Sequence, residues 1–515
     1  MHEELPAEKE GSVQAVTHSH KAVSLWTSIR KYPRITAWSF SLSLGILLWG
    51  YDLVIVGTVA SIPAFQRVFG RPYEDRWIIS SSWLAVWAIS SNIGLMAGSV
   101  VFGWAQDRIG RRWSLAVTSL ICSVSVAICY VADLPVSIEA RRGVFFLAKT
   151  IQGFAIGGIM CTTQTWLSEV VPTELRGSLM SIFPIFKLLG QLVGALVCFS
   201  VIESDSKSSY RLCFATQWPF SAPLTILALL LPESPAWLLR KGREAAAIKA
   251  MLRLRGRGKD GSTLHADTAV RHLRETIDGE GTQIEKATYV DCFKTIQRRR
   301  TAIVCFAEFI PLLFGLQLLG SASYFLQQIG LDAETGVLLQ VIGIAIGILA
   351  SCVTFYTSSK FGRRTLVLGS LGAISILWLG VGVSGSWQNT FTAVGMMLVI
   401  FFAGIGAWPA TYAIASEASA LRLRAKTQGL GWFAYGLGTM IFGLIMPYLY
   451  NPDAANLGSK TAYVYFALAG LGVVATFFFI PEMKGRKNHE IDKLFDLRVS
   501  ARKFKRWELD DSGSV

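Results

Sequence analysis

The sequence is poor in charged residues. Only 16% of its 515 residues are Asp, Glu, Lys or Arg, against about 25% in an average soluble domain. Hydrophobic residues make up 52% of the chain, so too few polar groups are present to cover a folded surface of this size. That balance excludes an ordinary water-soluble protein and favours one that is solvated by lipid.

Neither the histidines nor the cysteines occur in a pattern that suggests a catalytic or metal-binding site. All six histidines lie outside the long apolar runs, so a proton relay inside a membrane would have to use carboxylates, lysines or hydroxyls. Seven of the eight cysteines lie within or at the ends of apolar runs, the exception being Cys292. A thiol there behaves as a small apolar group, and we expect no disulfide framework, metal site or cofactor. No nucleophile–base pair or phosphate loop suggests an enzyme.

Apolar runs long enough to cross a bilayer recur along the chain, each about 17 to 25 residues long. About twelve are visible in the sequence, near 36–58, 79–104, 113–132, 143–168, 177–202, 212–231, 301–326, 334–358, 365–385, 391–416, 427–449 and 462–480. A bilayer core offers backbone groups no other hydrogen-bond partners, so every span should be helical. The predicted fold class is therefore an all-α integral membrane protein with twelve transmembrane helices.

The net charge of +14 follows membrane topology and does not indicate nucleic-acid binding. With an even number of spans, the dense basic clusters all fall on the side of both termini, a positive-inside pattern that predicts two cytosolic termini. These clusters are Arg108, Arg111 and Arg112; the 232–300 segment; Lys360, Arg363 and Arg364; Arg422, Arg424 and Lys426; and the tail after Pro481. The polar residues 1–35 are typical of a cytosolic tail and not of a cleaved signal.

Three charged motifs occur twice, about 250 positions apart. DRIGRR, ending at Arg112, is echoed by SSKFGRR, ending at Arg364; LSEVVPTELRG by ASEASALRLRA; and PESPAWLLRKGR by PEMKGR. The repeat predicts two six-helix pseudo-repeats in the same orientation, an arrangement typical of transporters whose halves rock against each other. The predicted units are a tail at 1–35, a first bundle at 36–231, a cytosolic linker at 232–300, a second bundle at 301–481 and a tail at 482–515.

Together these motifs resemble the sugar porters of the major facilitator superfamily. GYD at Gly50 to Asp52, DRIGRR, SEVVPTELRG, PESPAWLL, FGRR and PEMKGR stand in the order of that family over residues 40–496. IPAFQRVFG, SASYFLQQIGL, YAIASEASALRLRAKT and PYLYNPDAANLGSK are similar to the fungal maltose/α-glucoside permease branch. The resemblance implies a major facilitator fold, a small-molecule solute and a proton as partners, a monomer in the lipid bilayer and, by default, the plasma membrane.

The resemblance implies that Asp52 is a proton acceptor controlled by a basic residue in the fourth span. The family often has arginine there, and this chain has Lys149, four residues before Gly153. A lysine can stabilise the Asp52 anion and release it on protonation. The alternative is a permanent buried ion pair without a switching role.

The resemblance also implies a network of charges that gates the cytosolic side. Its members here are Asp107, Arg108, Arg111, Arg112, Glu169, Arg176 and Glu233 in the first half, and Arg363, Arg364, Glu417, Arg424 and Glu482 in the second. Such charges can pair when that side is shut and separate when it opens. Ser359 occupies the place of an expected Asp, so we expect an asymmetric network in which the first half carries more of the charge.

The sugar-binding amides of the family are largely missing. Pro184, Pro311, Leu312 and Gly347 stand where it has Gln, Gln, Gln and Asn. The polar and aromatic candidates that remain for substrate binding are Lys187, Gln191, Gln317, Tyr324, Trp408, Tyr412 and Tyr435. Lys187 would favour an anionic or strongly hydrogen-bonding substrate; alternatively it snorkels to an interface, and the aromatic residues are simply packing. Glu308 is either a counter-charge to a cavity lysine or a vestibule residue.

Three functions remain open at this stage. The first is a proton-coupled importer of a sugar or sugar-like solute, and the second is an exporter of a fungal secondary metabolite, which the depleted amide set suggests. A non-transporting nutrient sensor ranks last, because the tail after Pro481 is too short for a sizeable signalling domain.

Overall fold

The computed structural model describes residues 25–60, 62–73, 76–201, 209–256, 264–279, 287–322, 325–326, 329–331, 333–384, 389–450, 455–486, 488–504 and 507. Within them the chain is almost entirely helical, as the apolar runs predict. The exception is a short antiparallel hairpin, β1 (Arg71–Tyr73) with β2 (Arg76–Ile78), in which Pro72 pairs with Trp77.

The first half contains six spans. They are α2 (Pro33–Val59), α4 (Ser81–Ile109), α5 (Arg111–Tyr130), α6 (Ile138–Val170), α7 (Thr173–Met180) continued by α8 (Ile182–Ser200), and α9 (Ser209–Ala215) continued by α10 (Trp218–Leu230). α1 (Leu25–Lys31) precedes them, and α3 (Pro63–Phe69) lies beside the hairpin.

The second half repeats the pattern. Its spans are α14 (Thr295–Leu313) with α15 (Leu316–Gly320), α17 (Ala333–Lys360), α18 (Arg363–Ser384), α19 (Asn389–Phe402) with η3 (Ala403–Ala407) and α20 (Trp408–Ala418), α21 (Arg424–Tyr450) and α22 (Thr461–Phe479). Between the halves lie α11 (Pro235–Arg240), α12 (Glu244–Arg255), α13 (Leu264–Gly279) and η2 (Val290–Phe293), and η4 (Gly458–Lys460) and α23 (Asn488–Asp496) complete the elements.

Eleven helices in the described part of the chain are long and apolar enough to cross a membrane. The remaining span is α14, which differs from the predicted run at 301–326. It begins six residues earlier and carries Arg298, Arg299 and Arg300 in its first turns, and the helix breaks at Gly315, whose φ is +97°. A Cβ there would lie 2.9 Å from the Trp378 ring, so glycine suits both the backbone and the space.

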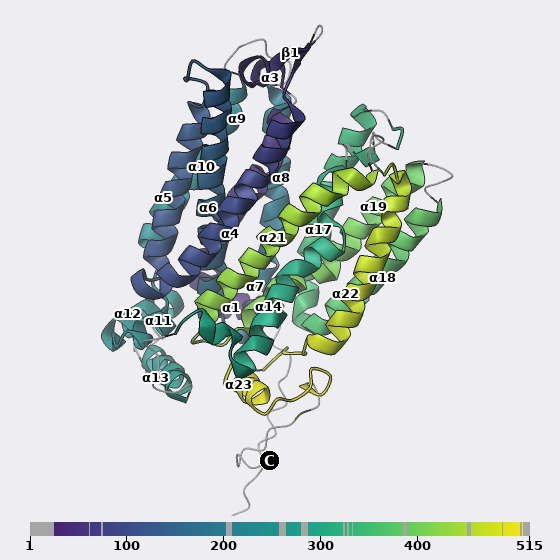
Figure 1. Ribbon diagram of the computed structural model, residues 1–515. Helices are drawn as coiled ribbons and strands as arrows, with labels where there is room; N and C mark the ends of the chain where they lie inside the picture. The colour runs from purple at the N-terminus through teal and green to yellow at the C-terminus, as the bar shows by residue number, and fades with distance from the viewer. Residues whose placement is uncertain are drawn as a thin grey trace, which may run out of the picture.

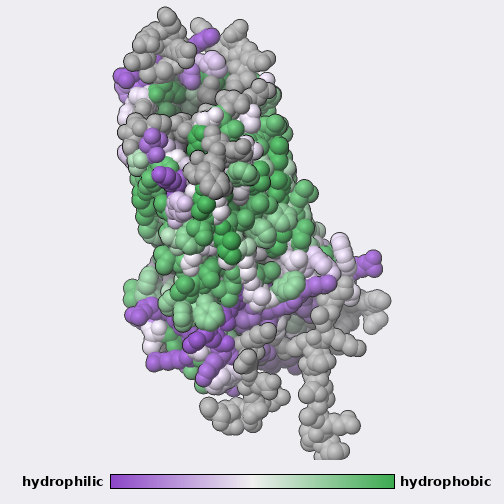
Figure 2. Space-filling model, turned by 90° about the vertical axis from the view of Figure 1, so that its right-hand side faces the viewer, coloured by the Kyte–Doolittle hydropathy of each residue, from purple (hydrophilic) through white to green (hydrophobic). Residues whose placement is uncertain are grey.

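Figure 1 shows the two halves as separate bundles that converge at one end. We call this the linker end; it carries α11, α12, α13 and α23, and the β1–β2 hairpin lies at the opposite end (Figure 1). Figure 2 shows an apolar band across the middle of this face of the molecule, with hydrophilic residues gathered along its lower edge near the linker end. An apolar band of this kind is what a bilayer core requires of a protein surface.

Glycines allow the helices of the first half to approach closely. A Cβ on Gly50 of α2 would lie 2.0 Å from the Lys187 carbonyl oxygen of α8, and one on Gly153 of α6 would lie 2.1 Å from the Ser91 carbonyl oxygen of α4. Membrane helices pack through such small-residue contacts, because lipid supplies no hydrophobic drive for their association. These contacts hold α2 against α8 and α4 against α6.

The tenth span contains one turn of π-helix, η3, directly before Trp408. Its wider turn is supported by side chains of neighbouring helices: Thr354 donates to the Gly404 carbonyl at 2.6 Å, and Ser370 donates to the Phe402 carbonyl at 2.5 Å. π-Turns often occur at functional sites because they change the direction of the following side chains.

Candidate functional site

A buried ion pair joins the first and fourth spans. Lys149 of α6 donates to Asp52 of α2, and both side chains are shielded from solvent. Lys149 also donates to Gln152 at 3.0 Å, and Gln152 in turn donates to Gln217 at 2.5 Å. The two residues predicted for proton coupling are therefore in contact. They belong to a row of hydrogen-bonded side chains that also includes Gln152 and Gln217, which the sequence analysis did not identify.

Lys187 lies at the centre of an aromatic cluster formed by both halves. Its ammonium is 4.1 Å from the Trp49 ring centroid and 5.3 Å from those of Trp408 and Tyr435, distances at which a cation is attracted to a ring face. It also donates to the Tyr435 hydroxyl at 2.9 Å. The side chain is fully buried, so it does not snorkel to an interface.

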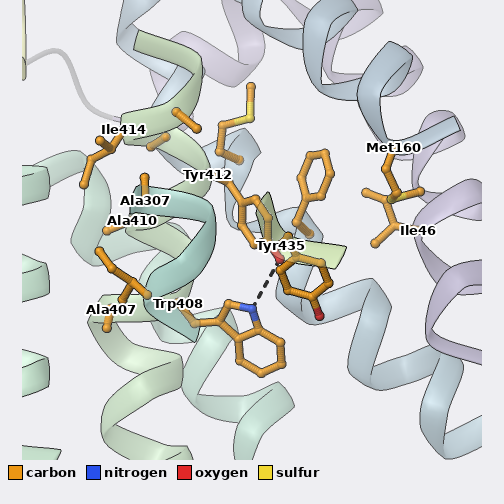
Figure 3. Packing of buried hydrophobic residues seen from close by; sticks show 14 of the residues in the cluster. Ile46, Met160, Ala307, Ala407, Trp408, Ala410, Tyr412, Ile414 and Tyr435 are labelled. Atoms are coloured by element: carbon orange, nitrogen blue, oxygen red, sulfur yellow. Dashed lines mark hydrogen bonds between the residues drawn. The ribbon is translucent and has the colours of Figure 1, made fainter. Parts of the chain in front are cut away.

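The aromatic wall continues on the second half (Figure 3). Trp408 donates to the Tyr412 hydroxyl at 3.4 Å, and Tyr412 stacks on Phe183 of α8 with ring centroids 4.8 Å apart. Trp432 lies edge-on to Trp49 at 5.2 Å. Trp408 and Tyr435 thus lie against Lys187, and Tyr412 lies next to Trp408. All three are substrate-binding candidates of the sequence analysis, which did not include Trp49 and Trp432.

Glu308 is bound across the interface between the halves. Gln164 of α6 donates to the Glu308 carboxylate of α14 at 2.9 Å and accepts from the Trp432 indole at 2.5 Å. The second Glu308 oxygen has no hydrogen-bond partner among the described residues. Glu308 is therefore a buried residue of the interface and not a vestibule residue. Gln164 is one of two glutamines in the fourth span, with Gln152, and an amide within a membrane span was the signal that could have pointed to it.

The other predicted substrate residues lie further from Lys187. Gln191 is half-buried one turn along α8, and Gln317 on α15 faces Gly443 of α21. Within the described ranges, neither glutamine forms a hydrogen bond with a residue of the Lys187 cluster. Tyr324 lies outside the described residues.

At the linker end of the first half, Arg111 is the centre of a buried charge network. It donates to Glu169 at 2.8 Å and to Asp107 at 3.1 Å. Arg240, which the sequence analysis did not single out, donates to the same Glu169 oxygen at 2.7 Å. Four charges of both signs are thereby paired out of water, which buried charges require.

Glu233 completes this network through the backbone. It accepts from the amides of Arg111 and Arg112 at 3.0 and 3.1 Å, at the start of α5, where a negative charge is favoured by the helix dipole. Burial nevertheless raises the pKa of Glu233, outweighing the lowering by the backbone amides and by Arg111.

The second half repeats this arrangement with the same residue types. Arg363 donates to Glu417 at 2.9 Å, and Glu482 accepts from the amides of Arg363 and Arg364 at 3.0 and 3.2 Å. The duplicated motifs of the sequence therefore form duplicated local structures, each with an arginine at the start of a helix, a glutamate from the end of the next span, and a second glutamate that caps the helix beginning at the arginine.

The contacts that cross between the halves at the linker end are not equivalent. Lys426 of α21 pairs with Asp107 of α4 at 2.5 Å. Next to the pseudo-equivalent place, Ser178 of α7 and Ser358 of α17 share a hydroxyl contact of 3.4 Å. Ser359, which stands where the first half has Asp107, donates to the Tyr356 carbonyl. One crossing is thus an ion pair and the other a weak neutral contact.

Further contacts close the linker end between the halves. Arg424 donates to the Ser168 carbonyl at 3.0 Å, and Tyr289 of the linker donates to the Val100 carbonyl. Arg176 donates to Asn488 at 3.1 Å. Among the other predicted gate residues, the Arg108 guanidinium covers the Trp104 ring at 4.5 Å, and Arg364 donates to the Phe477 carbonyl at 2.8 Å.

The profile of the family described as "Sugar (and other) transporter" matches residues 38–495, almost the whole chain. The chain belongs to this family. Within the sugar transporter family, it is 30% identical to the alpha-glucosides permease MPH3 of Saccharomyces cerevisiae, over 96% of this chain and 82% of the relative. It is 28% identical to the MFS transporter fmqE of Aspergillus fumigatus, over 97% of this chain and 92% of the relative.

A solved structure confirms the architecture. The chain superposes on the proton:xylose symporter XylE bound to 6-bromo-6-deoxy-D-glucose with a TM-score of 0.78, at 20% identity, over 90% of this chain and 99% of the other. The predicted twelve-helix major facilitator fold is correct, and the protein is a multi-pass secondary active transporter and not an enzyme.

Proposed function

We propose that this member of the sugar transporter family imports a sugar or sugar-like solute together with a proton across the plasma membrane. One observation carries the proposal: a carboxylate and a lysine, Asp52 and Lys149, are paired inside the bundle, out of contact with water. Burying ionisable side chains within a membrane costs free energy, and such residues are usually retained because they have a function. The relatives named as an alpha-glucosides permease and a proton:xylose symporter support both the solute class and the coupling ion.

The linker end is the cytosolic end in this proposal, because it carries the dense basic clusters. Both termini are then cytosolic, and the chain divides into the tail at 1–35, the bundles at 36–231 and 301–481, the linker at 232–300 and the tail at 482–515. The transporter works as a monomer, since each copy contains both halves.

Helix α2 links the proton site to the substrate site. Trp49 and Asp52 are three residues apart and so lie on the same side of the helix. Trp49 supports the Lys187 ammonium, Asp52 holds Lys149, and the helix is packed tightly on α8 at Gly50. Protonation of Asp52 releases Lys149 from its partner, and the resulting shift of α2 moves the Trp49 ring that contacts Lys187.

The cytosolic gate is the set of contacts at the linker end. The residues that form it are Asp107, Arg108, Arg111, Arg112, Glu169, Arg176, Glu233, Arg363, Arg364, Glu417, Arg424 and Glu482, joined by Arg240 and Lys426. Closure is favoured by the Asp107–Lys426 pair and by the Arg424–Ser168 contact. Opening toward the cytosol must break both contacts, so these residues bias a two-state equilibrium.

The substrate binds around Lys187, against the rings of Trp408, Tyr412 and Tyr435, with Gln191 and Gln317 further along the path; Tyr324, the remaining candidate, lies outside the described residues. Aromatic faces suit the apolar face of a pyranose, and the ammonium supplies hydrogen bonds to hydroxyl or carboxylate oxygens. Where the family uses amides, this chain has Pro184, Pro311 and Gly347, so its selectivity differs from that of a simple hexose carrier.

The loss of these sugar-binding amides also favours a second candidate function, the export of a secondary metabolite. A site formed by three large rings and a lysine accepts a planar anionic metabolite as readily as a sugar acid. Import and export use the same fold and differ in direction and coupling.

The test is uptake of labelled maltose, glucose and a sugar acid in yeast lacking its own sugar permeases, at acidic pH, with and without a protonophore. We expect accumulation that the protonophore abolishes. Asp52→Asn should lose accumulation but keep exchange of labelled for unlabelled solute, because the binding site stays intact. Glu139→Gln, an exposed carboxylate of the same half at 69% exposure, is the matched control and should accumulate normally.

Two outcomes would overturn the proposal. Accumulation that survives in Asp52→Asn would remove Asp52 as the coupling site. No uptake of any label, with the protein verified at the cell surface, would favour export.

A further inference from the structure

A groove of about 750 Å³ opens on the outer surface of the second half at the linker end. It runs between α14 and α22, beside the turn that follows α23. Its inner part is apolar, formed by Ile303, Phe306 and Phe479, and its rim is basic, formed by Arg298, Arg299 and Arg498. The groove lies outside the substrate path and plays no part in the function proposed above.

The rim carries positive charge without a local counter-charge. Among the described residues, no carboxylate lines the groove, and none of the salt bridges found there involves Arg298, Arg299 or Arg498. The nearby Arg300, in contrast, is paired with Asp492. Arg298 and Arg498 are exposed, so their guanidinium groups remain available to a ligand.

Arg299 is held in place by the C-terminal segment. It donates to the Val499 carbonyl at 2.7 Å and lies over the rings of Phe495 and Phe504 at 5.3 and 5.8 Å. This contact fixes the segment that carries Arg498 against the start of α14. The basic rim is therefore built from two parts of the chain about 200 positions apart.

The groove has the depth and position of a lipid site. Arg298 and Phe306 are eight residues apart on α14, roughly 12 Å along the helix axis, so the apolar part reaches well into the bilayer core. Phe479 is 64% exposed at the end of α22, and this end of the helix lies toward the linker end (Figure 1). A ligand bound here has a negative head at the membrane surface and an apolar tail.

We propose that this groove binds one anionic phospholipid of the cytosolic leaflet. Its phosphate lies between Arg298 and Arg498, and one acyl chain follows Ile303 and Phe306. Only the choice of leaflet rests on the orientation in the proposed function. Basic pockets between transmembrane helices on the cytosolic side are suited to anionic headgroups, with about 1 kcal/mol for each arginine near the surface.

The test is photocrosslinking of the full chain in phosphatidylcholine nanodiscs that contain a small fraction of phosphatidylserine with a photoactivatable acyl chain. Mass spectrometry should find the label on residues 298–306 and 475–479. An excess of unlabelled phosphatidylserine should remove it, and an excess of phosphatidylcholine should not. Labelling spread evenly over the apolar band, or equal competition by phosphatidylcholine, overturns the proposal.

Variants give an independent measurement. Arg298→Gln and Arg498→Gln should each weaken phosphatidylserine binding about five-fold, and together about twenty-five-fold, whereas Arg271→Gln, an exposed arginine of α13 away from the groove, should not change it. Inorganic phosphate at millimolar concentration should fail to displace the lipid. Displacement by phosphate, or an equal loss in the Arg271 variant, would show a general attraction of anions in place of a lipid site. The wild-type labelling map remains decisive if a variant does not fold.

Discussion

Lys187 of the first half donates a hydrogen bond of 2.9 Å to the hydroxyl of Tyr435 in the second half, and both side chains are buried. Rings from both halves surround the same ammonium. Because rocking transporters move one half against the other around a fixed site, a contact of this kind must change during the cycle. In the function proposed above, Lys187 both contacts the solute and senses the movement of the halves.

Replacing Lys187 by methionine should separate acidic from neutral solutes. We expect the KM for a sugar acid to rise at least ten-fold, since a hydrogen bond to a charged group contributes about 1.5 to 3 kcal/mol, while the KM for maltose changes about two-fold. Tyr435→Phe keeps the ring and removes the hydroxyl, so it should affect both solutes alike and weakly. An equal effect of Lys187→Met on both solutes would contradict selection of an anion.

The unequal crossings at the linker end predict unequal mutational effects. Lys426→Gln removes the ion pair with Asp107 and should favour opening on that side, whereas Ser178→Ala removes only a 3.4 Å hydroxyl contact. Cys292 is buried near Thr427 and reports opening through its rate of maleimide modification. We expect that rate to rise several-fold in Lys426→Gln and to stay unchanged in Ser178→Ala.

A double-mutant cycle checks that this effect comes from the pair itself. Asp107→Asn, Lys426→Gln and the double variant should show a coupling of about 0.5 to 3 kcal/mol. Additive effects of the two substitutions on the modification rate would mean that the two residues act independently.

The raised pKa of Glu233 makes part of the stability pH-dependent. Burial raises this pKa above its ordinary value of 4.5, so the folded state binds the proton more tightly than the unfolded state. The stability contributed in this way is fully present below pH 4.5 and is lost as the pH rises through the folded-state pKa.

Glu233→Gln cannot titrate and should flatten this part of the profile. The measurement is the thermal unfolding midpoint of both proteins from pH 4 upward. A wild-type midpoint that falls no faster than that of the variant would be evidence against the shift. Glu482→Gln, the corresponding change in the second half, tests whether the effect is specific to Glu233.

Gly50 should be among the positions least tolerant of a methyl group. A Cβ there would meet the Lys187 carbonyl oxygen at 2.0 Å, while a Cβ on Gly372 of α18 would meet no atom within 4 Å. We expect Gly50→Ala to cost about 1 to 3 kcal/mol and to lower the yield of folded protein, because α2 and α8 must separate. Gly372→Ala should be neutral, and similar yields of the two variants would argue against the close packing.

Sequence patterns predicted the architecture because each membrane helix requires a long apolar run. The duplicated charged motifs predicted a group of charges in each half but not which side chains pair. Arg111 pairs with Glu169 and Arg363 with Glu417, since both halves keep the same residue types at similar separations of 58 and 54 positions. The ends of the seventh span were less predictable, because the break at Gly315 depends on packing against Trp378.

Contacts between the halves could not be predicted in the same way. Lys426 pairs with Asp107, Gln164 donates to Glu308, and the Trp432 indole donates to Gln164, all across the interface. Their partners are more than 100 positions away, and no local pattern records which side chain of the other half will face them.

The sequence by itself determined that this protein is a twelve-helix membrane transporter of two repeated halves, with Asp52 and Lys149 as its charged residues of interest inside the first bundle. Only the tertiary structure decided that Lys187 is enclosed by rings from both halves, and that one crossing at the linker end is an ion pair while its counterpart is a pair of hydroxyls. The reason is physical: helix formation in a membrane follows from local composition, whereas the partner of a buried polar group follows from how two separately formed bundles pack.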